Sequence, residues 1–193
     1  NDKHMGSLAD ECAQKIGRSR EDQDKYSIQS FHRAEEGWKS GCLDVFPVNG
    51  VEKDEVISKL IEGKVATLKP CFNQNGTITA ASSSAIADGA ACIVLASENY
   101  VKSHENKIAK PIARILAYAD AGRDPKEFTL APIDAAKKVI QKAGLSVEQI
   151  DLWEVNEAFA VVPLMLIKEF NLSQDVVNVF GGGISIGHPL GCT

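Results

Sequence analysis

The sequence predicts an α/β protein in which helices cover both faces of a layered sheet. Apolar residues recur at helical spacing in several segments, and short apolar runs between them are typical of buried strands. The two kinds of segment alternate along the chain, which favours a layered α/β architecture. With 193 residues, 44% of them hydrophobic, the chain is long enough for one large domain or two small ones.

Two helices are expected at the start of the chain. Residues 7–15 show helical spacing, and Gly17 follows as a stop signal. Ser19 is a good N-cap for a second helix, whose first turn carries two acidic side chains that suit the helix dipole. This second helix is expected to stop at Gly41.

The middle of the chain is less regular. Residues 43–48 predict a short strand, and residues 49–76 predict a loop-rich region because charged and loop-forming residues interrupt any clear period. A serine-rich turn follows, with a helical turn ending near Asp88. An apolar strand is then expected at residues 91–96 and a polar helix at residues 97–107.

The C-terminal part alternates again. Residues 111–122 predict a strand, and residues 132–144 predict an amphipathic helix that ends at a glycine. A strand then changes to a helix at Asn156, and the helix continues over residues 161–169. Residues 178–183 predict a last strand that leads into a glycine-rich turn.

Charge and cysteine content exclude several classes of protein. The net charge of −5 argues against nucleic acid or an anionic membrane as a partner. No apolar run is long enough for a membrane span, and the first residues are too polar for a secretory signal. The five cysteines are odd in number and form no CxxC pair, which favours a reducing compartment and argues against a metal site.

Two short motifs carry candidate chemistry. In VNEAFA, Asn156 and Glu157 lie where a strand becomes a helix, so that two polar side chains and free N–H groups face a ligand, although Asn156 would serve equally as a helix cap. In GHP, Gly187 and Pro189 restrict the backbone around His188, and three preceding glycines allow close approach of a substrate. His188 is therefore a candidate general base or oxyanion donor, with a loop histidine as the alternative.

Five motifs together resemble the thiolase family, specifically its acetyl-CoA acetyltransferase type. They lie in the family's order and approximate spacing: HMG at 4–6, AxxxxQKIGxSRExQD at 9–24, NGTITAASSSAIADGAA at 75–91, VNEAFA at 155–160 and GGGISIGHPLGCT at 181–193. The resemblance implies an incomplete thiolase-like layered fold. Its parts would be a CoA-contacting loop domain at 1–83, a return segment of the N-terminal domain at 84–108 and a truncated C-terminal domain at 109–193.

The resemblance also implies roles for individual residues. His188 would activate a nucleophilic cysteine and help to form an oxyanion hole, and Asn156 would hold a water that completes the hole. Coenzyme A would contact His4, Met5, Phe72, Ala80, Ser84 and Phe159. Ser84 has a second interpretation as a helix cap, and Phe159 has one as a core residue.

The chain departs from the family pattern in three places. Both catalytic cysteines of thiolases would lie outside these residues, so the 193 residues alone are expected to be inactive and to form part of a protein about twice as long. The segment between Val48 and Leu68 is shorter than in the family. Ser82 replaces an asparagine, which puts the local hydrogen bonding in question.

The implied activity is that of an acyltransferase that condenses two acetyl-CoA into acetoacetyl-CoA and CoA, or runs the reverse thiolysis. CoA thioesters would be substrates, with no permanently bound cofactor and no metal. The alternatives are a 3-ketoacyl-CoA thiolase of longer chain preference and a non-catalytic CoA- or lipid-binding protein. A homodimer or homotetramer is implied, in the cytoplasm or mitochondrion, with the peroxisome as a third option.

Overall fold

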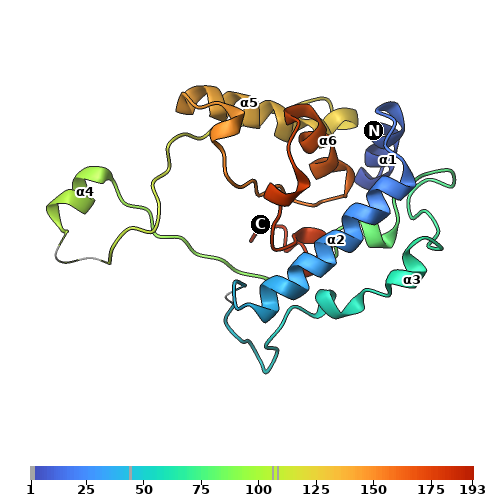
Figure 1. The fold of residues 1–193 in the computed structure, drawn as a ribbon, viewed down its shortest axis with the longest axis horizontal. Coiled ribbons are helices and arrows are strands. Elements are labelled where there is room, and N and C mark those ends of the chain that lie inside the picture. The colour runs from blue at the N-terminus through green and yellow to red at the C-terminus, as the bar shows by residue number, and fades with distance from the viewer. Residues whose placement is uncertain (1–2, 44, 106, 108) are drawn as a thin grey trace.

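The structure is a computed structural model that describes residues 3–43, 45–105, 107 and 109–193. Helices dominate these residues, and Figure 1 shows most of them packed around one centre. The α-helices are α1 (Met5–Lys15), α2 (Arg20–Lys39), α3 (Glu62–Val65), α4 (Glu98–Ser103), α5 (Ala131–Ala143), α6 (Val161–Phe170) and α7 (Gly183–Ile186). Short 3-10 helices are η1 (Glu55–Lys59), η2 (Ala80–Ser82), η3 (Pro125–Leu130), η4 (Val147–Gln149) and η5 (Gln174–Val176).

Local capping interactions fix the first two helices where the sequence predicts them. The Nδ1 atom of His4 accepts the amide of Gly6 at 3.1 Å at the start of α1, and Gly17 follows its end with a φ of +69°. The hydroxyl of Ser19 accepts the amide of Asp22 at 3.0 Å and so caps α2. The predictions for both helices are confirmed.

Helix α6 forms the centre of the core because its first six residues, 161–166, are apolar and all buried. One cluster of buried side chains lies between α6, α1 and the segments around Trp153 and Val177. A second cluster joins α6 to α2 and α7, and its buried members are Tyr26, Phe31, Ala160, Leu164 and Ile184. The predicted helices at 132–144 and 161–169 are confirmed as α5 and α6.

The predicted strands are not formed among the described residues, which contain only isolated β-bridges such as Trp153 with Val177. The predictions of strands at 91–96, 111–122 and 178–183, and of a sheet covered on both faces, are therefore wrong for these residues. The reason is physical: a strand hydrogen-bonds only to a neighbouring strand. No other described segment forms a ladder with 91–96 or 111–122.

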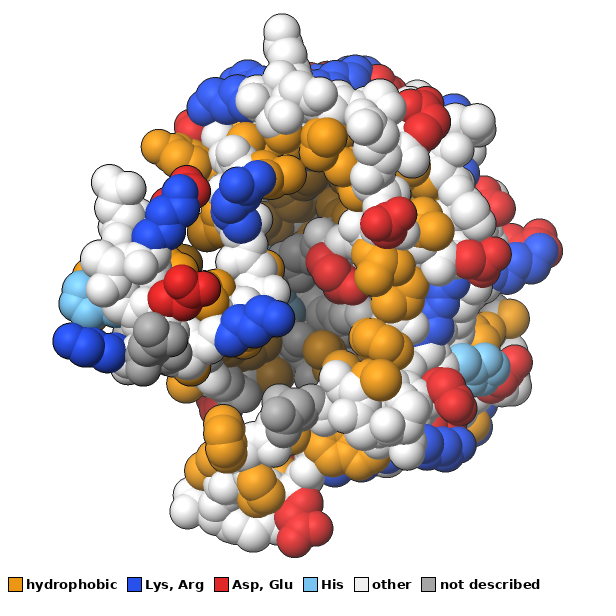
Figure 2. Space-filling model, turned by 60° about the vertical axis from the view of Figure 1, so that its left-hand side comes forward, with side chains coloured by type: hydrophobic (Ala, Val, Ile, Leu, Met, Phe, Trp, Pro, Cys, Tyr) orange, Lys and Arg blue, Asp and Glu red, His pale blue; other side chains and the backbone are white. Residues whose placement is uncertain are grey.

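These two segments instead extend away from the core on either side of α4, as Figure 1 shows. Figure 2 shows hydrophobic side chains gathered around a hollow on the side of the molecule that carries α4. A helix has its hydrogen bonds within one segment, so α4 forms although its surroundings are open. The large exposed apolar residues of the two segments are Ile93, Val94, Leu95, Ile112, Ile115, Leu116 and Tyr118.

Three smaller expectations have mixed outcomes. The helical turn predicted before Asp88 is wrong, because residues 84–97 hold no helix. The polar helix predicted at 97–107 is present as the shorter α4, and Asn106 lies outside the described residues. Of the predicted strand at 43–48, Asp44 lies outside the described residues, and Val48 forms only a bridge to Val51.

The loop-rich region predicted at 49–76 is largely confirmed, with η1 and α3 as its only helices among the described residues. Nor does any helix in the described part of the chain combine the length and apolar composition that crossing a membrane requires.

Candidate active site

Asn156 lies at the end of an extended segment that runs beside the segment around Val177. The amide of Trp153 donates to the carbonyl of Val176 at 2.8 Å, and the amide of Asn178 donates back to Trp153 at 2.9 Å. Asn156 lies three residues after Trp153 and is exposed. Helix α6 begins only at Val161, so the alternative interpretation of Asn156 as its cap is wrong.

Glycines shape the loop that carries His188. Gly181 has a φ of +77°, and a Cβ there would lie 2.6 Å from a backbone oxygen of α2. Gly187 has a φ of +94°, and its Cβ would lie 2.7 Å from the side chain of Ala87. The amide of His188 donates to the carbonyl of Ala85 at 2.7 Å, which fixes the end of the loop. Glycine is required at both positions because the backbone is left-handed there and neighbouring atoms lie close to where a Cβ would be.

The two loops bring the predicted catalytic residues together. The Nδ2 atom of Asn156 lies 3.4 Å from Nε2 of His188. A Cβ at Gly183 would lie 3.3 Å from Oδ1 of Asn156 and 3.5 Å from the Cβ of His188, so a small residue is needed between them. The amide and the imidazole therefore present two polar groups at one place on the molecule.

Beside them lies the carboxylate of Glu157. The sequence analysis expected this side chain, like that of Asn156, at a ligand-facing edge, and that expectation is wrong. Glu157 is fully buried, and its Oε1 accepts the hydroxyl of Tyr26 at 2.7 Å and the amide of Asn178 at 3.1 Å. Its Oε2 accepts the hydroxyl of Ser30 at 2.7 Å and the backbone amide of Ile184 at 3.2 Å. Burial, and then the charge of Glu157, raise the pKa of the Tyr26 phenol well above its usual value.

The residues expected to contact CoA include a stack of three rings. The imidazole of His4 lies flat on Phe72, with ring centroids 5.1 Å apart, and Phe159 meets Phe72 edge-on at 5.7 Å. A Cβ at Gly6 would lie 2.3 Å from the Phe72 ring, so glycine permits the stack. Met5 is exposed beside it. The buried Phe159 also belongs to the core, as its second interpretation predicts.

Ala80 and Ser84 lie in the serine-rich turn, which is tied to the segment before α6. The amide of Ser84 donates to Ala158 at 3.1 Å, and the amide of Ala160 donates to Ser82 at 2.9 Å. No helix begins between Ser84 and Ser97, so the interpretation of Ser84 as a cap is wrong. Thr79 is the N-cap of η2, and its backbone amide donates to the hydroxyl of Ser82 at 2.9 Å.

Family models match almost the whole chain. The model of the thiolase N-terminal domain matches residues 1–99, and that of the thiolase C-terminal domain matches residues 109–193. The chain belongs to the thiolase family. The resemblance found in the sequence is thus confirmed, whereas the predicted domain limits at residues 83 and 108 stay predictions.

Thiolase relatives share this chain's sequence over about half of their own length. Mitochondrial acetyl-CoA acetyltransferase of Rattus norvegicus is 43% identical over 200 residues, which cover 97% of this chain and 46% of the relative. The cytosolic acetyl-CoA acetyltransferase of Gibberella zeae is 40% identical and is covered over 50% of its length.

Solved thiolase structures confirm the incomplete thiolase-like fold. The Acat5 thiolase of Ascaris suum, in complex with coenzyme A, superposes with a TM-score of 0.93 at 44% identity. The acetyl-CoA acetyltransferase of Bacillus anthracis gives a TM-score of 0.90 at 36% identity. The superpositions cover 98% and 99% of this chain but 50% of each of the two structures.

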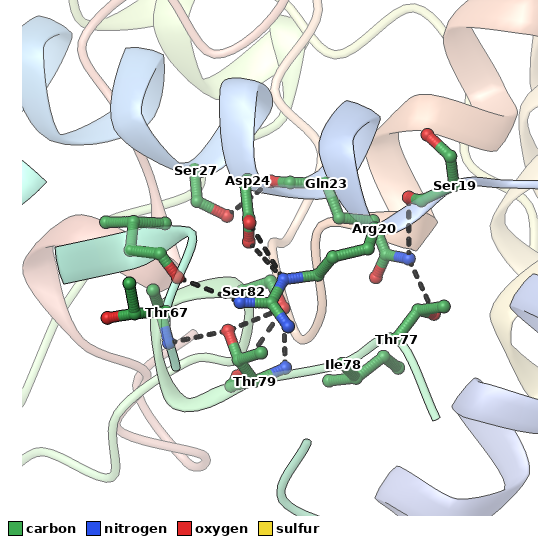
Figure 3. A network of polar contacts seen from close by, with 12 residues as sticks. Ser19, Arg20, Gln23, Asp24, Ser27, Thr67, Thr77, Ile78, Thr79 and Ser82 are labelled. Carbon is green, nitrogen blue, oxygen red and sulfur yellow. Dashed lines mark hydrogen bonds and ion pairs between the residues drawn. The ribbon is translucent and has the colours of Figure 1, made fainter. Parts of the chain in front are cut away.

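A second polar network ties the start of α2 to the loop region at residues 65–77. The Nε atom of Arg20 donates to both oxygens of Asp24 at 2.8 Å, and its guanidinium also donates to the carbonyl of Val65 at 2.8 Å. The amide of Gln23 donates to the hydroxyl of Thr77 at 2.9 Å (Figure 3). This network anchors the loop region against α2.

The cysteines of this thiolase chain are scattered. Cys12 is buried in the core, where its sulfur accepts the hydroxyl of Thr129 at 3.0 Å. Cys42, Cys71 and Cys92 are exposed, and Cys192 is partly exposed. In the described part of the chain, no hydrogen bond joins a cysteine to His188, and no group of three or more metal-binding side chains occurs.

Proposed function

We propose that the protein containing this chain is an acetyl-CoA acetyltransferase that condenses two acetyl-CoA into acetoacetyl-CoA and CoA, or runs the reverse thiolysis. The observation that carries the proposal is the 3.4 Å separation between Asn156 Nδ2 and His188 Nε2 on two converging loops. Relatives that are 40% and 43% identical are named as acetyl-CoA acetyltransferases.

The chemistry assigned to the two residues is acyl transfer through a cysteine that lies outside residues 1–193. His188 takes the proton of the cysteine thiol, and the thiolate attacks the thioester carbonyl to form a new C–S bond. The carbonyl oxygen gains negative charge, which His188 and a water held by Asn156 stabilise. The charged intermediate then collapses and expels CoA as the thiolate. One such prearranged donor contributes about 3 kcal/mol to transition-state stabilisation.

We propose that His4, Met5, Phe72, Ala80, Ser84 and Phe159 contact the CoA part of the substrates. The continuous stack of His4, Phe72 and Phe159 supports this assignment, because it supplies a rigid apolar surface beside a polar loop. The Ascaris suum relative holds coenzyme A, which supports CoA thioesters as the substrate class. No permanently bound cofactor is part of the proposal.

The proposal extends to compartment and assembly. The named relatives are mitochondrial and cytosolic proteins, so we assign this protein to one of these two compartments. A homodimer or homotetramer is proposed from the family, and light scattering on the full-length protein measures its mass in solution.

The test is thiolysis of acetoacetyl-CoA by the full-length protein. His188→Ala and Asn156→Ala are each expected to lower kcat by about 10²- to 10³-fold. The control is His32→Ala, an exposed histidine on α2, which is expected to keep kcat within about two-fold, as surface substitutions usually do. A wild-type protein that releases no acetyl-CoA from acetoacetyl-CoA and CoA contradicts the proposal.

Chain-length preference needs a separate measurement. Relative kcat/KM values for 3-ketoacyl-CoA substrates of increasing length distinguish the acetoacetyl-CoA enzyme from a thiolase of longer chain preference. We expect the four-carbon substrate to give the highest value. A maximum at a longer chain assigns the protein to the second class.

A further inference from the structure

We propose that Glu157 is a positioning residue, whose buried carboxylate holds Asn156 and His188 at the separation at which they act. This inference rests on the proposed function. Glu157 touches neither of the two side chains in a hydrogen bond, but it is fully buried between the segments that carry them.

The four donors to Glu157 come from three separate parts of the chain. Tyr26 and Ser30 lie on α2, Asn178 precedes the glycine-rich loop, and Ile184 belongs to α7. Each carboxylate oxygen accepts two of these donors. One side chain therefore cross-links α2, the segment before the glycine run and the single turn that leads to the histidine.

The connection to His188 runs through α7. The backbone amide of Ile184 donates to Glu157, and four residues later the chain reaches His188. The neighbouring Ser185 hydroxyl lies 2.9 Å from the Ser30 hydroxyl, which is itself bound to Glu157. A Cβ at Gly182 would lie 2.7 Å from Cδ of Glu157, so the start of this turn packs directly on the carboxyl group.

The connection to Asn156 is through the backbone, since the two residues are adjacent. The amide of Val155 donates to Oδ1 of Asn178 at 2.7 Å, and Nδ2 of Asn178 donates back to the carbonyl of Val155 at 2.8 Å. Val155 and Glu157 thus bind the same asparagine on both sides of Asn156. Both catalytic loops are held against one buried network.

The chemistry of the network requires a carboxylate rather than a polar side chain of any kind. Its four donors are two hydroxyls and two amides, all neutral. A carboxylate offers about four acceptor sites and no donor, whereas the amide of glutamine turns an NH₂ group toward one pair of donors. Glutamine would be easier to bury than an unpaired charge, so a merely space-filling role would not favour glutamate.

The test compares Glu157→Gln with Asp24→Asn in the full-length protein. Asp24 is a matched control because it is also a largely buried carboxylate, bound to Arg20 on α2 away from the two catalytic loops. Glu157→Gln is expected to lower kcat by about 10²-fold, as displacements of about 1 Å do, with KM within about two-fold. Asp24→Asn is expected to lower the midpoint of unfolding but to leave kcat unchanged.

A double substitution separates positioning from general damage. If Glu157 acts by positioning Asn156 and His188, adding Glu157→Gln to Asn156→Ala should lower kcat by less than about ten-fold more, well short of its about 10²-fold effect in the wild type, because residues that act as a unit are not additive. If the losses in kcat of the two single variants multiply in the double variant, the proposal is overturned. A folded Glu157→Gln protein with wild-type kcat overturns it as well. Where Glu157→Gln fails to fold, Ser30→Ala replaces it, with an expected loss of about five-fold in kcat and the same criterion.

A structural readout keeps this inference separate from the proposed function. If wild-type protein has no thiolase activity, the proposed function fails, and crystal structures then decide the positioning role. The expected result is that the distance from Asn156 Nδ2 to His188 Nε2 grows by more than about 0.5 Å in Glu157→Gln. An unchanged distance overturns the inference.

Discussion

The imidazole of His4 lies face to face with the phenyl ring of Phe72, with centroids 5.1 Å apart and 17° between the ring planes. The His4 ring is held because its Nδ1 caps α1 by accepting the amide of Gly6. Phe72 is held in turn by the edge of Phe159. The proposed CoA surface is therefore built by helix capping and core packing before any ligand binds.

Phe72→Leu should raise KM for acetoacetyl-CoA by about three- to ten-fold while kcat stays within about two-fold. The reason is that aromatic pairs contribute about 0.5–1.5 kcal/mol beyond buried area. A binding surface used equally in the ground and transition states affects KM alone. Steady-state kinetics of the full-length protein measure both constants.

Phe128→Leu is the matched control for this substitution. Phe128 also packs against Phe159, at a centroid distance of 6.4 Å, but it is not among the residues expected to contact CoA. It should lower stability and leave KM unchanged. Equal changes of KM in the two variants would mean that Phe72 acts only through the core.

Gly181→Ala should destabilise the protein more than Gly144→Ala does. Both glycines have positive φ, +77° and +67°, so both substitutions carry the strain of a left-handed backbone, about 1–2 kcal/mol. Only at Gly181 does the new Cβ also meet neighbours, at 2.5 Å from Oγ of Ser185 and 2.6 Å from the Ser30 carbonyl. Overpacking is therefore expected to lower the free energy of unfolding of Gly181→Ala by an additional amount of about 1–3 kcal/mol.

Urea unfolding of both glycine variants measures this difference. Gly144 ends α5 in open space, so Gly144→Ala isolates the effect of backbone conformation. Equal losses of stability would show that the loop can move away from α2 without penalty.

The helices could be predicted from the sequence because their determinants are local. The Ser19 cap of α2 and the Gly144 stop of α5 lie within a few residues of the hydrogen bonds that they affect. The strands could not be placed in the same way, because apolar runs such as residues 91–96 form a ladder only with a partner. In the described residues this apolar run has no strand partner, and it is therefore exposed coil.

The candidate site shows the same division. Asn156 and His188 were identified because glycine, proline and motif context mark them locally. The burial of Glu157 was not predicted, although the sequence places this residue beside Asn156, since it depends on partners 131 and 127 positions away along the chain, Tyr26 and Ser30. No local pattern reports such a network.

Backbone amides of residues 91–96 and 112–118 should exchange slowly with solvent in the full-length protein. The relatives are about twice as long as this chain, so partners for these exposed apolar segments are expected outside residues 1–193. Strand pairing would bury both backbone and side chains. Hydrogen exchange measured by mass spectrometry tests this, with Asn49 and Gly50, at the tip of an exposed turn, as a fast-exchanging internal reference. Fast exchange in both apolar segments would contradict strand pairing.

Glu154→Gln should stabilise the protein at pH 7 and have no effect at about pH 3. Burial and then the charge of Glu157 raise the pKa of Glu154 in the folded protein. When the pKa of a carboxyl group is raised in the folded protein, the protonated group stabilises the folded state at pH values below the ordinary pKa near 4.3. This stabilisation is lost as the pH rises through the pKa of the folded protein. The ionised form therefore destabilises the folded state at pH 7, and glutamine removes that penalty. The carboxyl group is only partly desolvated, because the residue as a whole is exposed, so solvent screens its charge and the gain should stay below about 0.5 kcal/mol.

Glu148→Gln supplies a control of opposite sign for the pH experiment. A backbone hydrogen bond and then a bond from Ser146 lower the pKa of Glu148, so its ionised form stabilises the folded state. This stabilisation is present at pH values above the ordinary pKa and is lost as the pH falls through the lower pKa of the folded protein. Glu148→Gln should thus destabilise at pH 7, where Glu154→Gln stabilises. If Glu154→Gln gave the same gain at both pH values, the effect would come from packing, because a charge effect must disappear when the carboxyl group is protonated in both states.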